Sequence, residues 1–99
     1  MQRDGIAVGC ERETMKRIYK YEIHSGGTVQ LPPDAEILSV GVQYNQLVCW
    51  ANVEPSDKIE TQHLFIGGTG FEPPVNPGRF LGTHLLDGGS TVLHVWERA

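Results

Sequence analysis

The sequence predicts a single all-β domain, a small antiparallel β-sandwich or flattened barrel of about seven short strands. Three observations predict this fold class. Apolar residues alternate with polar ones over short runs, turns rich in glycine and proline separate these runs, and no long helical periodicity occurs. The chain has 99 residues, which is enough for one domain with one thin core.

The first residues of the chain are polar and show no sustained periodicity. We predict that residues 1–14 are a flexible N-terminal extension and that residues 15–99 form the β domain. The net charge of −4 lacks the basic excess typical of nucleic-acid-binding proteins, so we expect no direct nucleic-acid binding. No apolar run approaches the roughly 18 residues of a membrane span, so we expect no membrane insertion.

The first two predicted strands are residues 17–23 and 28–31. The segment between them, residues 25–27, contains two glycines, which can adopt the positive φ angles of a tight turn. A three-residue loop here predicts a hairpin that pairs Ile23 with Val29. A pair of prolines then ends the second strand, because proline cannot donate a backbone hydrogen bond.

The next two predicted strands, residues 37–44 and 47–54, have the clearest alternation in the chain. A two-residue turn at residues 45–46 predicts a hairpin in which Tyr44 pairs with Leu47. In this register one face of the hairpin is apolar along its whole length, and a slip of one residue would move that face to solvent.

The remaining predicted strands are residues 59–66, 80–86 and 91–96, and a long loop spans residues 67–79. The last hairpin has two registers that the sequence leaves open. In one, His84 faces Leu93 and His94 faces Thr83; in the other, the two histidines face each other.

The inward-facing positions of these strands give a predicted core. Its members are apolar, aromatic or small: Tyr21, Ile23, Val29, Leu31, Leu38, Val40, Val42, Leu47, Cys49, Ala51, Val53, Leu64, Ile66, Leu81, Leu85 and Val92.

No pattern of catalytic or metal-binding residues stands out. The histidines lie in separate segments, and Cys49 alternates with apolar neighbours in the manner of a small core residue. No nucleophile elbow, dinucleotide fingerprint or P-loop occurs. We therefore expect a protein that is not an enzyme, with no catalytic residues, no metal and no cofactor.

The long loop carries the first set of candidate binding residues. Its glycine-rich start, Gly68, Thr69 and Gly70, could form a backbone nest for an anion, with Arg79 as the nearest cation. This arrangement would suit a small phosphorylated ligand.

Phe71 and Glu72 lie at the middle of the loop, which three prolines stiffen. We expect Phe71 to enter a pocket of a protein partner, with Arg79 adding charged hydrogen bonds at the rim. The alternative is that Phe71 folds back and plugs an open end of the sandwich. Trp50 is a further candidate, because it occupies a polar strand face opposite Gly41.

The chain resembles a family of small all-β proteins encoded mostly by phages and prophages. The resemblance begins at Met15 and follows the predicted strands and turns at residues 15–21, 29–32, 35–40, 49–53, 67–70, 80–83 and 93–97. It implies an accessory protein made in the host cytoplasm and assigns no reaction.

These observations favour a non-enzymatic phage protein that binds a host protein and inhibits or sequesters it, as anti-defence and anti-CRISPR inhibitors do. An acidic protein can compete for basic host surfaces. The alternatives are a sponge for a small ligand such as a cyclic nucleotide, and a minor structural protein of the virion. An exposed edge strand would favour a homodimer.

Overall fold

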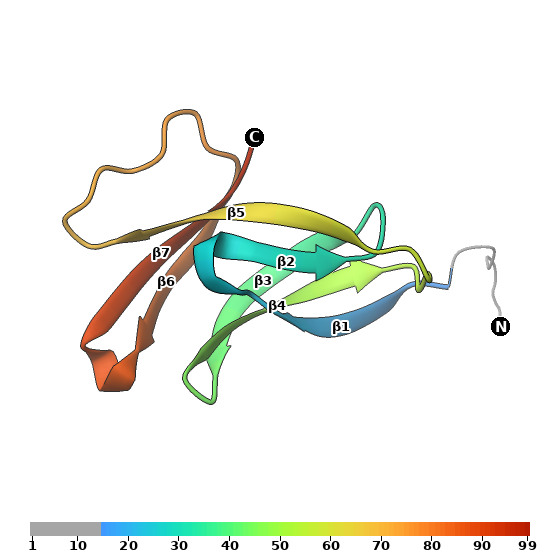
Figure 1. Cartoon of the computed structure of the whole chain (residues 1–99), viewed down its shortest axis with the longest axis horizontal. Coiled ribbons are helices and arrows are strands. Elements are labelled where there is room, and N and C mark those ends of the chain that lie inside the picture. The colour runs from blue at the N-terminus through green and yellow to red at the C-terminus, as the bar shows by residue number, and fades with distance from the viewer. Residues whose placement is uncertain (1–14) are drawn as a thin grey trace, which may run out of the picture.

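A computed structural model describes residues 15–99 as two antiparallel β-sheets packed face to face (Figure 1). The predicted all-β fold class is confirmed. The predicted N-terminal extension, residues 1–14, lies outside the described residues. The three-stranded sheet has the order β1 (Arg17–Glu22), β4 (Gln46–Val53), β3 (Glu36–Gln43). The four-stranded sheet has the order β2 (Thr28–Leu31), β5 (Glu60–Gly68), β7 (Thr91–Glu97), β6 (Phe80–Leu86).

The core lies between the two sheets. Nine residues of the predicted core are buried: Ile23, Val29, Leu31, Val40, Leu47, Cys49, Ala51, Val53 and Leu64. Four more are partly buried and pack against them: Tyr21, Val42, Ile66 and Leu81. The prediction was wrong for Leu38 and Leu85, which are exposed, and for Val92, which is half-buried but does not pack against the core. It missed three buried residues: Ile37, Val48 and Val95.

The predicted hairpin between β1 and β2 does not form. A short 3-10 turn, η2 (Ser25–Gly27), joins the strands, but β1 pairs with β4 and β2 pairs with β5. Val29 therefore lies opposite Gln62 and not Ile23. The chain crosses from one sheet to the other at η2, so the apolar residues of β1 and β2 face each other across the core instead of lying side by side in one sheet.

The β3–β4 hairpin forms, but its turn begins one residue earlier than expected, which moves the pairing register by two residues. Tyr44 and Asn45 are the central residues, both with positive φ (52° and 59°), as a type I′ turn requires. Leu47 therefore pairs with Val42, and Tyr44 is almost wholly exposed. The side-chain amide of Gln46 donates to the carbonyl of Ile23 (2.8 Å), which keeps Gln46 at the start of β4. A shift of two residues preserves which side chains face inward, so Val40, Leu47 and their neighbours are still buried.

A β-bulge explains the error at Leu38. The register shifts between Ile37 and Ser39, so Leu38 is an extra residue without a partner in β4. As a result Ile37 turns into the core, while Leu38 is 40% exposed.

The β6–β7 hairpin adopts the register in which His84 faces Leu93 and Thr83 faces His94. The two histidines therefore lie on opposite faces of the sheet. A second bulge follows between Phe80 and Thr83, so Phe80 pairs with Trp96. The turn of this hairpin is the 3-10 segment η3 (Asp87–Gly89).

The β3–β4 and β6–β7 turns are clasped to each other by Asn45 and Asp87. The Asn45 amide donates to Asp87 Oδ1 (2.8 Å), and the Asp87 backbone N–H donates to Asn45 Oδ1 (2.6 Å). The Thr91 hydroxyl donates to the second carboxylate oxygen of Asp87 (2.8 Å). These hydrogen bonds from Asn45 and Thr91 lower the pKa of Asp87 below its ordinary value of 3.8.

We expect Thr91→Val to raise the pKa of Asp87 toward 3.8, because one of the donors to the carboxylate is lost. A carboxyl whose pKa is lower in the folded state stabilises the fold above its unfolded pKa, and this contribution disappears as the pH falls through the folded pKa. The stability difference between wild type and Thr91→Val should therefore shrink on acidification. Urea denaturation at several pH values measures it. If NMR showed that the Asp87 carboxyl titrates at the same pH in both proteins, the hydrogen bond from Thr91 to Asp87 would be contradicted.

Candidate interaction surface

The outer face of the four-stranded sheet carries a strip of aromatic side chains, which we call the aromatic strip: Phe65, Phe80, His94 and Trp96. Because Val95 is buried in the core, its neighbours His94 and Trp96 point to the outer face. Trp96 pairs with Phe65 on one side and with Phe80 on the other. The Phe80 and Trp96 ring centroids are 5.2 Å apart, within the range of favourable aromatic pairs. The strip therefore runs across three adjacent strands.

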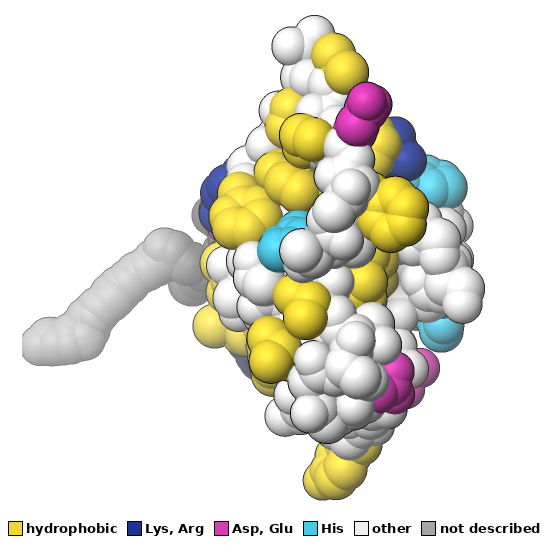
Figure 2. Space-filling model, turned by 90° about the vertical axis from the view of Figure 1, so that its left-hand side faces the viewer, with side chains coloured by type: hydrophobic (Ala, Val, Ile, Leu, Met, Phe, Trp, Pro, Cys, Tyr) yellow, Lys and Arg dark blue, Asp and Glu magenta, His cyan; other side chains and the backbone are white. Residues whose placement is uncertain are grey.

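The two ends of the aromatic strip differ: the end at Phe65 is covered by a cation, and the end at Phe80 is exposed to solvent. The Arg98 guanidinium carbon lies 4.0 Å from the centroid of the Phe65 ring, a cation–π arrangement. At the β6 edge, just over half of the Phe80 and Leu85 side chains is exposed. Figure 2, which looks at the side of the molecule with the long loop and the β6–β7 turn, shows several hydrophobic side chains with polar atoms between them. Exposed apolar surface of this kind is typical of protein interaction sites.

His94 ties the long loop to the aromatic strip. Its Nε2 lies 2.8 Å from the Thr69 hydroxyl, and its Nδ1 lies 2.9 Å from the Thr83 hydroxyl. A neutral imidazole has one donor and one acceptor nitrogen, so one hydroxyl accepts a hydrogen bond and the other donates. The ring is thereby fixed, and so is the start of the loop.

The loop itself spans residues 69–79 and is shorter than predicted. Gly67 and Gly68 belong to β5, where they pair with His94 and Leu93. Of the predicted glycine nest, only Thr69 and Gly70 lie in the turn that follows. The loop leaves the body of the molecule beyond the end of β5 (Figure 1).

Phe71 projects from this loop and is 78% exposed. The edge of its ring lies next to Gly68, where a Cβ atom would be 3.2 Å from Phe71 Cδ2. The alternative that Phe71 plugs the end of the sandwich is therefore wrong. Glu72 and Val75 are also exposed, so the tip of the loop combines two apolar side chains with a carboxylate.

Arg79 has partners other than those expected. Its guanidinium donates to the backbone carbonyl of Ile37 in β3 and pairs with the Glu97 carboxylate in β7 (3.4 Å). The backbone of Glu97 also bonds to Gly78 and Arg79, both at 2.8 Å. Arg79 therefore links the two sheets at the end of the loop, and its charge is already balanced by Glu97.

Trp50 lies apart from the loop residues. It is on the outer face of the three-stranded sheet, opposite Ser39, and it is half-buried. The expected proximity to Gly41 occurs diagonally, since a Cβ on Gly41 would lie 2.9 Å from Trp50 Cζ3. Trp50 belongs to the three-stranded sheet, whereas Phe71 lies in the loop between two strands of the other sheet, so the structure does not bring these two candidates together.

Sequence reasoning found Phe71 and Glu72 but missed the aromatic strip beside them. The strip depends on the pairing of β5 with β7, which are distant in the chain. The available signal was the repeated occurrence of an aromatic residue at outward positions, Phe65, Phe80 and Trp96.

A comparison with protein-family models matches residues 15–99, which is the whole described part of the chain. The chain belongs to the DUF7352 family, a domain of unknown function. No curated protein and no solved structure matches the chain.

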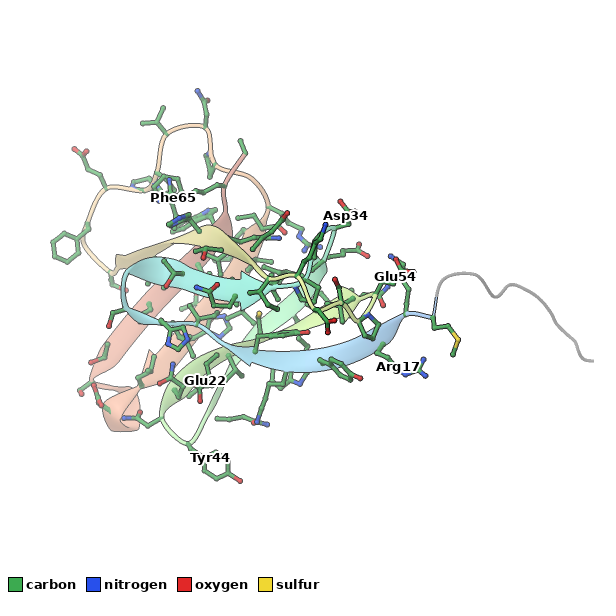
Figure 3. All side chains as sticks on the ribbon, turned by 45° about the vertical axis from the view of Figure 1, so that its right-hand side comes forward. Arg17, Glu22, Asp34, Tyr44, Glu54 and Phe65 are labelled. Atoms are coloured by element: carbon green, nitrogen blue, oxygen red, sulfur yellow. The ribbon has the colours of Figure 1, made fainter. Side chains whose placement is uncertain are left out.

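This DUF7352 domain also has a hollow of about 480 Å³ at the end of the sandwich near η2. Apolar core side chains and polar turn residues line it: Ile23, His24, Ser25, Gly26, Asn45, Gln46, Leu47, Ile66, Leu86 and Leu93. No Lys or Arg is among these lining residues. Figure 3 shows Tyr44 at the tip of the nearby β3–β4 hairpin, pointing away from the body.

The chemistry of the remaining candidates in the DUF7352 domain is modest. Burial raises the pKa of the Cys49 thiol to about 11, so at neutral pH it stays protonated and weakly nucleophilic. Within residues 15–99, no three His, Cys, Asp or Glu side chains gather in a way that could hold a metal ion. No helical segment in the described part of the chain is long and apolar enough to cross a membrane.

Proposed function

We propose that this DUF7352 chain is a non-enzymatic phage accessory protein that binds a host protein and inhibits or sequesters it. The observation that carries this proposal is the apolar surface exposed at the tip of the loop and along β6, the edge strand beside the aromatic strip. Its members are Phe71, Val75, Phe80 and Leu85, each more than half exposed. Covering such apolar surface removes it from water and lowers the free energy, and exposed apolar surface typically marks a binding site for another protein.

The loop is built to present Phe71 at low entropic cost. Three of its residues are prolines, which narrow the backbone freedom of the unbound loop. One end is held by Thr69 on His94, and the other end by Gly78 and Arg79 on Glu97. Because less freedom is lost on binding, more of the contact energy of Phe71 appears as affinity.

The nature of the partner follows from charge and from the resemblance to phage proteins. The chain carries a net charge of −4, and Glu72 stands beside Phe71. A host protein with a basic rim around an apolar pocket would complement this surface. The phage origin, the host cytoplasm as location and the inhibitory role rest on the resemblance and on analogy with anti-defence proteins.

A small phosphorylated ligand has less support. The one cation of the loop, Arg79, is bonded to Ile37 and Glu97, and the end hollow has no Lys or Arg in its lining. The virion alternative makes a separate prediction, since mass spectrometry of purified virions would then detect the chain.

We expect Phe71→Ala to weaken partner binding by more than about 1 kcal/mol, a loss of roughly fivefold or more in affinity, because a well-placed aromatic side chain is a common hot spot. The partner is first captured from host lysate on the full chain and identified. Its Kd is then measured for wild type, Phe71→Ala and a matched control, Ile59→Ala. Ile59 is also about half exposed, but it lies before β5, far along that strand from the loop.

Thermal melting of the same proteins supplies the second readout. Phe71 buries little surface, so Phe71→Ala should melt close to wild type. An unchanged Kd for Phe71→Ala, or an equal loss for Ile59→Ala, would refute the proposed surface.

A further inference from the structure

β1 is an edge strand with an exposed and self-complementary sequence. It is the outer strand of the three-stranded sheet, and within residues 15–99 no strand pairs with its second edge. The side chains from Arg17 to Lys20 are all exposed, although the strand holds Ile18 and Tyr19. A free strand edge offers a row of backbone donors and acceptors to another strand.

The hydrogen bonds between β1 and β4 show which residues of β1 point their backbone N–H and C=O groups to the free edge. The Ile23 N–H donates to the carbonyl of Leu47 in β4 (3.0 Å). In an antiparallel ladder every second residue faces the same neighbour, so Tyr21 and Tyr19 also face β4. The N–H and C=O groups of Ile18, Lys20 and Glu22 therefore point to the free edge.

This geometry limits how a second copy can pair with β1. In a symmetric antiparallel pair that extends the sheet, edge-facing residues must oppose each other, so the two-fold axis passes through a residue. An axis at Lys20 sets two lysines face to face. An axis at Ile18 sets Lys16 against Lys20. An axis at Tyr21 places part of the second copy's strand opposite η2, where the chain is no longer a strand that can pair with it.

The axis at Tyr19 avoids these conflicts and brings opposite charges together. It gives three kinds of facing pair: Lys16 with Glu22, Arg17 with Tyr21, and Ile18 with Lys20. The first is an ion pair, and the second places a guanidinium beside an aromatic ring. In the third, the Lys20 amine bonds to Gln43 in β3 (2.6 Å), on the side of β1 away from the free edge, so its charge does not lie over Ile18 of the second copy. The two Tyr19 residues face each other across the two-fold axis. They form a non-hydrogen-bonded pair, the kind of antiparallel pair in which the side chains are closest.

We propose that two copies of this chain associate through β1, antiparallel and centred on Tyr19, so that their three-stranded sheets form one continuous sheet. The occupant of the free edge is a second copy of the chain. This inference does not depend on the proposed function, because β1 and the aromatic strip belong to different sheets. A dimer would carry two copies of the loop and so could hold an oligomeric partner with added avidity.

The decisive variant is Lys20→Pro. The Lys20 N–H points to the free edge, so proline there removes hydrogen bonds to the second copy and leaves the ladder to β4 intact. Sedimentation equilibrium of the full chain should give twice the 11.0 kDa chain mass for wild type and the single mass for Lys20→Pro. Circular dichroism checks that the variant remains folded.

A charge exchange tests the register independently of folding defects. Glu22→Lys should weaken dimerisation roughly tenfold, because both ion pairs become like-charge pairs. Adding Lys16→Glu to it should restore the wild-type dimer. A monomeric wild type at high protein concentration would overturn the proposal. A dimer unaffected by Lys20→Pro and by Glu22→Lys, or one lost in Phe71→Ala instead, would overturn it equally.

Discussion

Gly27→Ala is expected to destabilise the domain by more than about 3 kcal/mol, a large fraction of the total stability of a small domain. Two causes add. Gly27 has a φ of +88°, a left-handed conformation that costs a residue with a Cβ roughly 1–2 kcal/mol. A Cβ at this position would also overlap the backbone carbonyl of Leu64, which cannot move without breaking β5 from its neighbours. Urea denaturation measures the loss.

Gly26→Ala is the matched control. Gly26 has nearly the same φ, +82°, but nothing lies within 4 Å of the position of its Cβ. It should therefore cost only the roughly 1–2 kcal/mol of the backbone conformation. Equal losses for the two variants would contradict the close approach of η2 to β5, and with it the crossing of the chain between the sheets.

The second large effect is expected at the bulge in β3. Ile37→Ala should cost about 2–5 kcal/mol, because it opens a cavity among buried side chains. Leu38→Ala should cost under about 1 kcal/mol, because Leu38 is outside the core and 40% exposed. Melting and urea denaturation of the two variants compare neighbouring residues of similar size. A larger loss at Leu38 would mean that β3 has no bulge and follows the regular alternation instead.

That comparison also shows where sequence reasoning stops. Alternation in residues 47–53 predicts that Leu47, Cys49, Ala51 and Val53 share a buried face, and the structure confirms that all four are buried. Val48 lies on the other face and is buried as well, which alternation did not predict. Alternation fixes only which side chains share a face. It cannot locate an inserted residue, so the bulge reverses the expected positions of Ile37 and Leu38.

Strand pairing between distant segments was the second limit. The glycine turn between β1 and β2 fits a local hairpin as well as a crossing between sheets, since both need positive φ at glycine. The choice depends on β4 and β5, which supply the actual partners of β1 and β2. These contacts are far apart in the chain and leave no local signal.

The candidate surface was predictable only where it depends on residues that are neighbours in the chain. Phe71 beside Glu72 in a proline-stiffened loop indicated exposure, which the structure confirms. The attachment of Arg79 to Ile37 and Glu97 required the two sheets to be in place. From the sequence, Arg79 was predicted to be a cation available to a ligand. In the fold its guanidinium is already bonded to Ile37 and Glu97.

Amide hydrogen exchange tests the central claim, that the loop and the open edge of the aromatic strip bind a host protein. Residues 69–79 lie outside the strand ladders, so most of their amides should exchange quickly in the unbound chain. In complex with the captured host protein, we predict that exchange of these amides slows by about tenfold or more, since contact with the partner excludes water. Unchanged exchange in residues 69–79, with new protection around Trp50 or at the end hollow, would contradict the account.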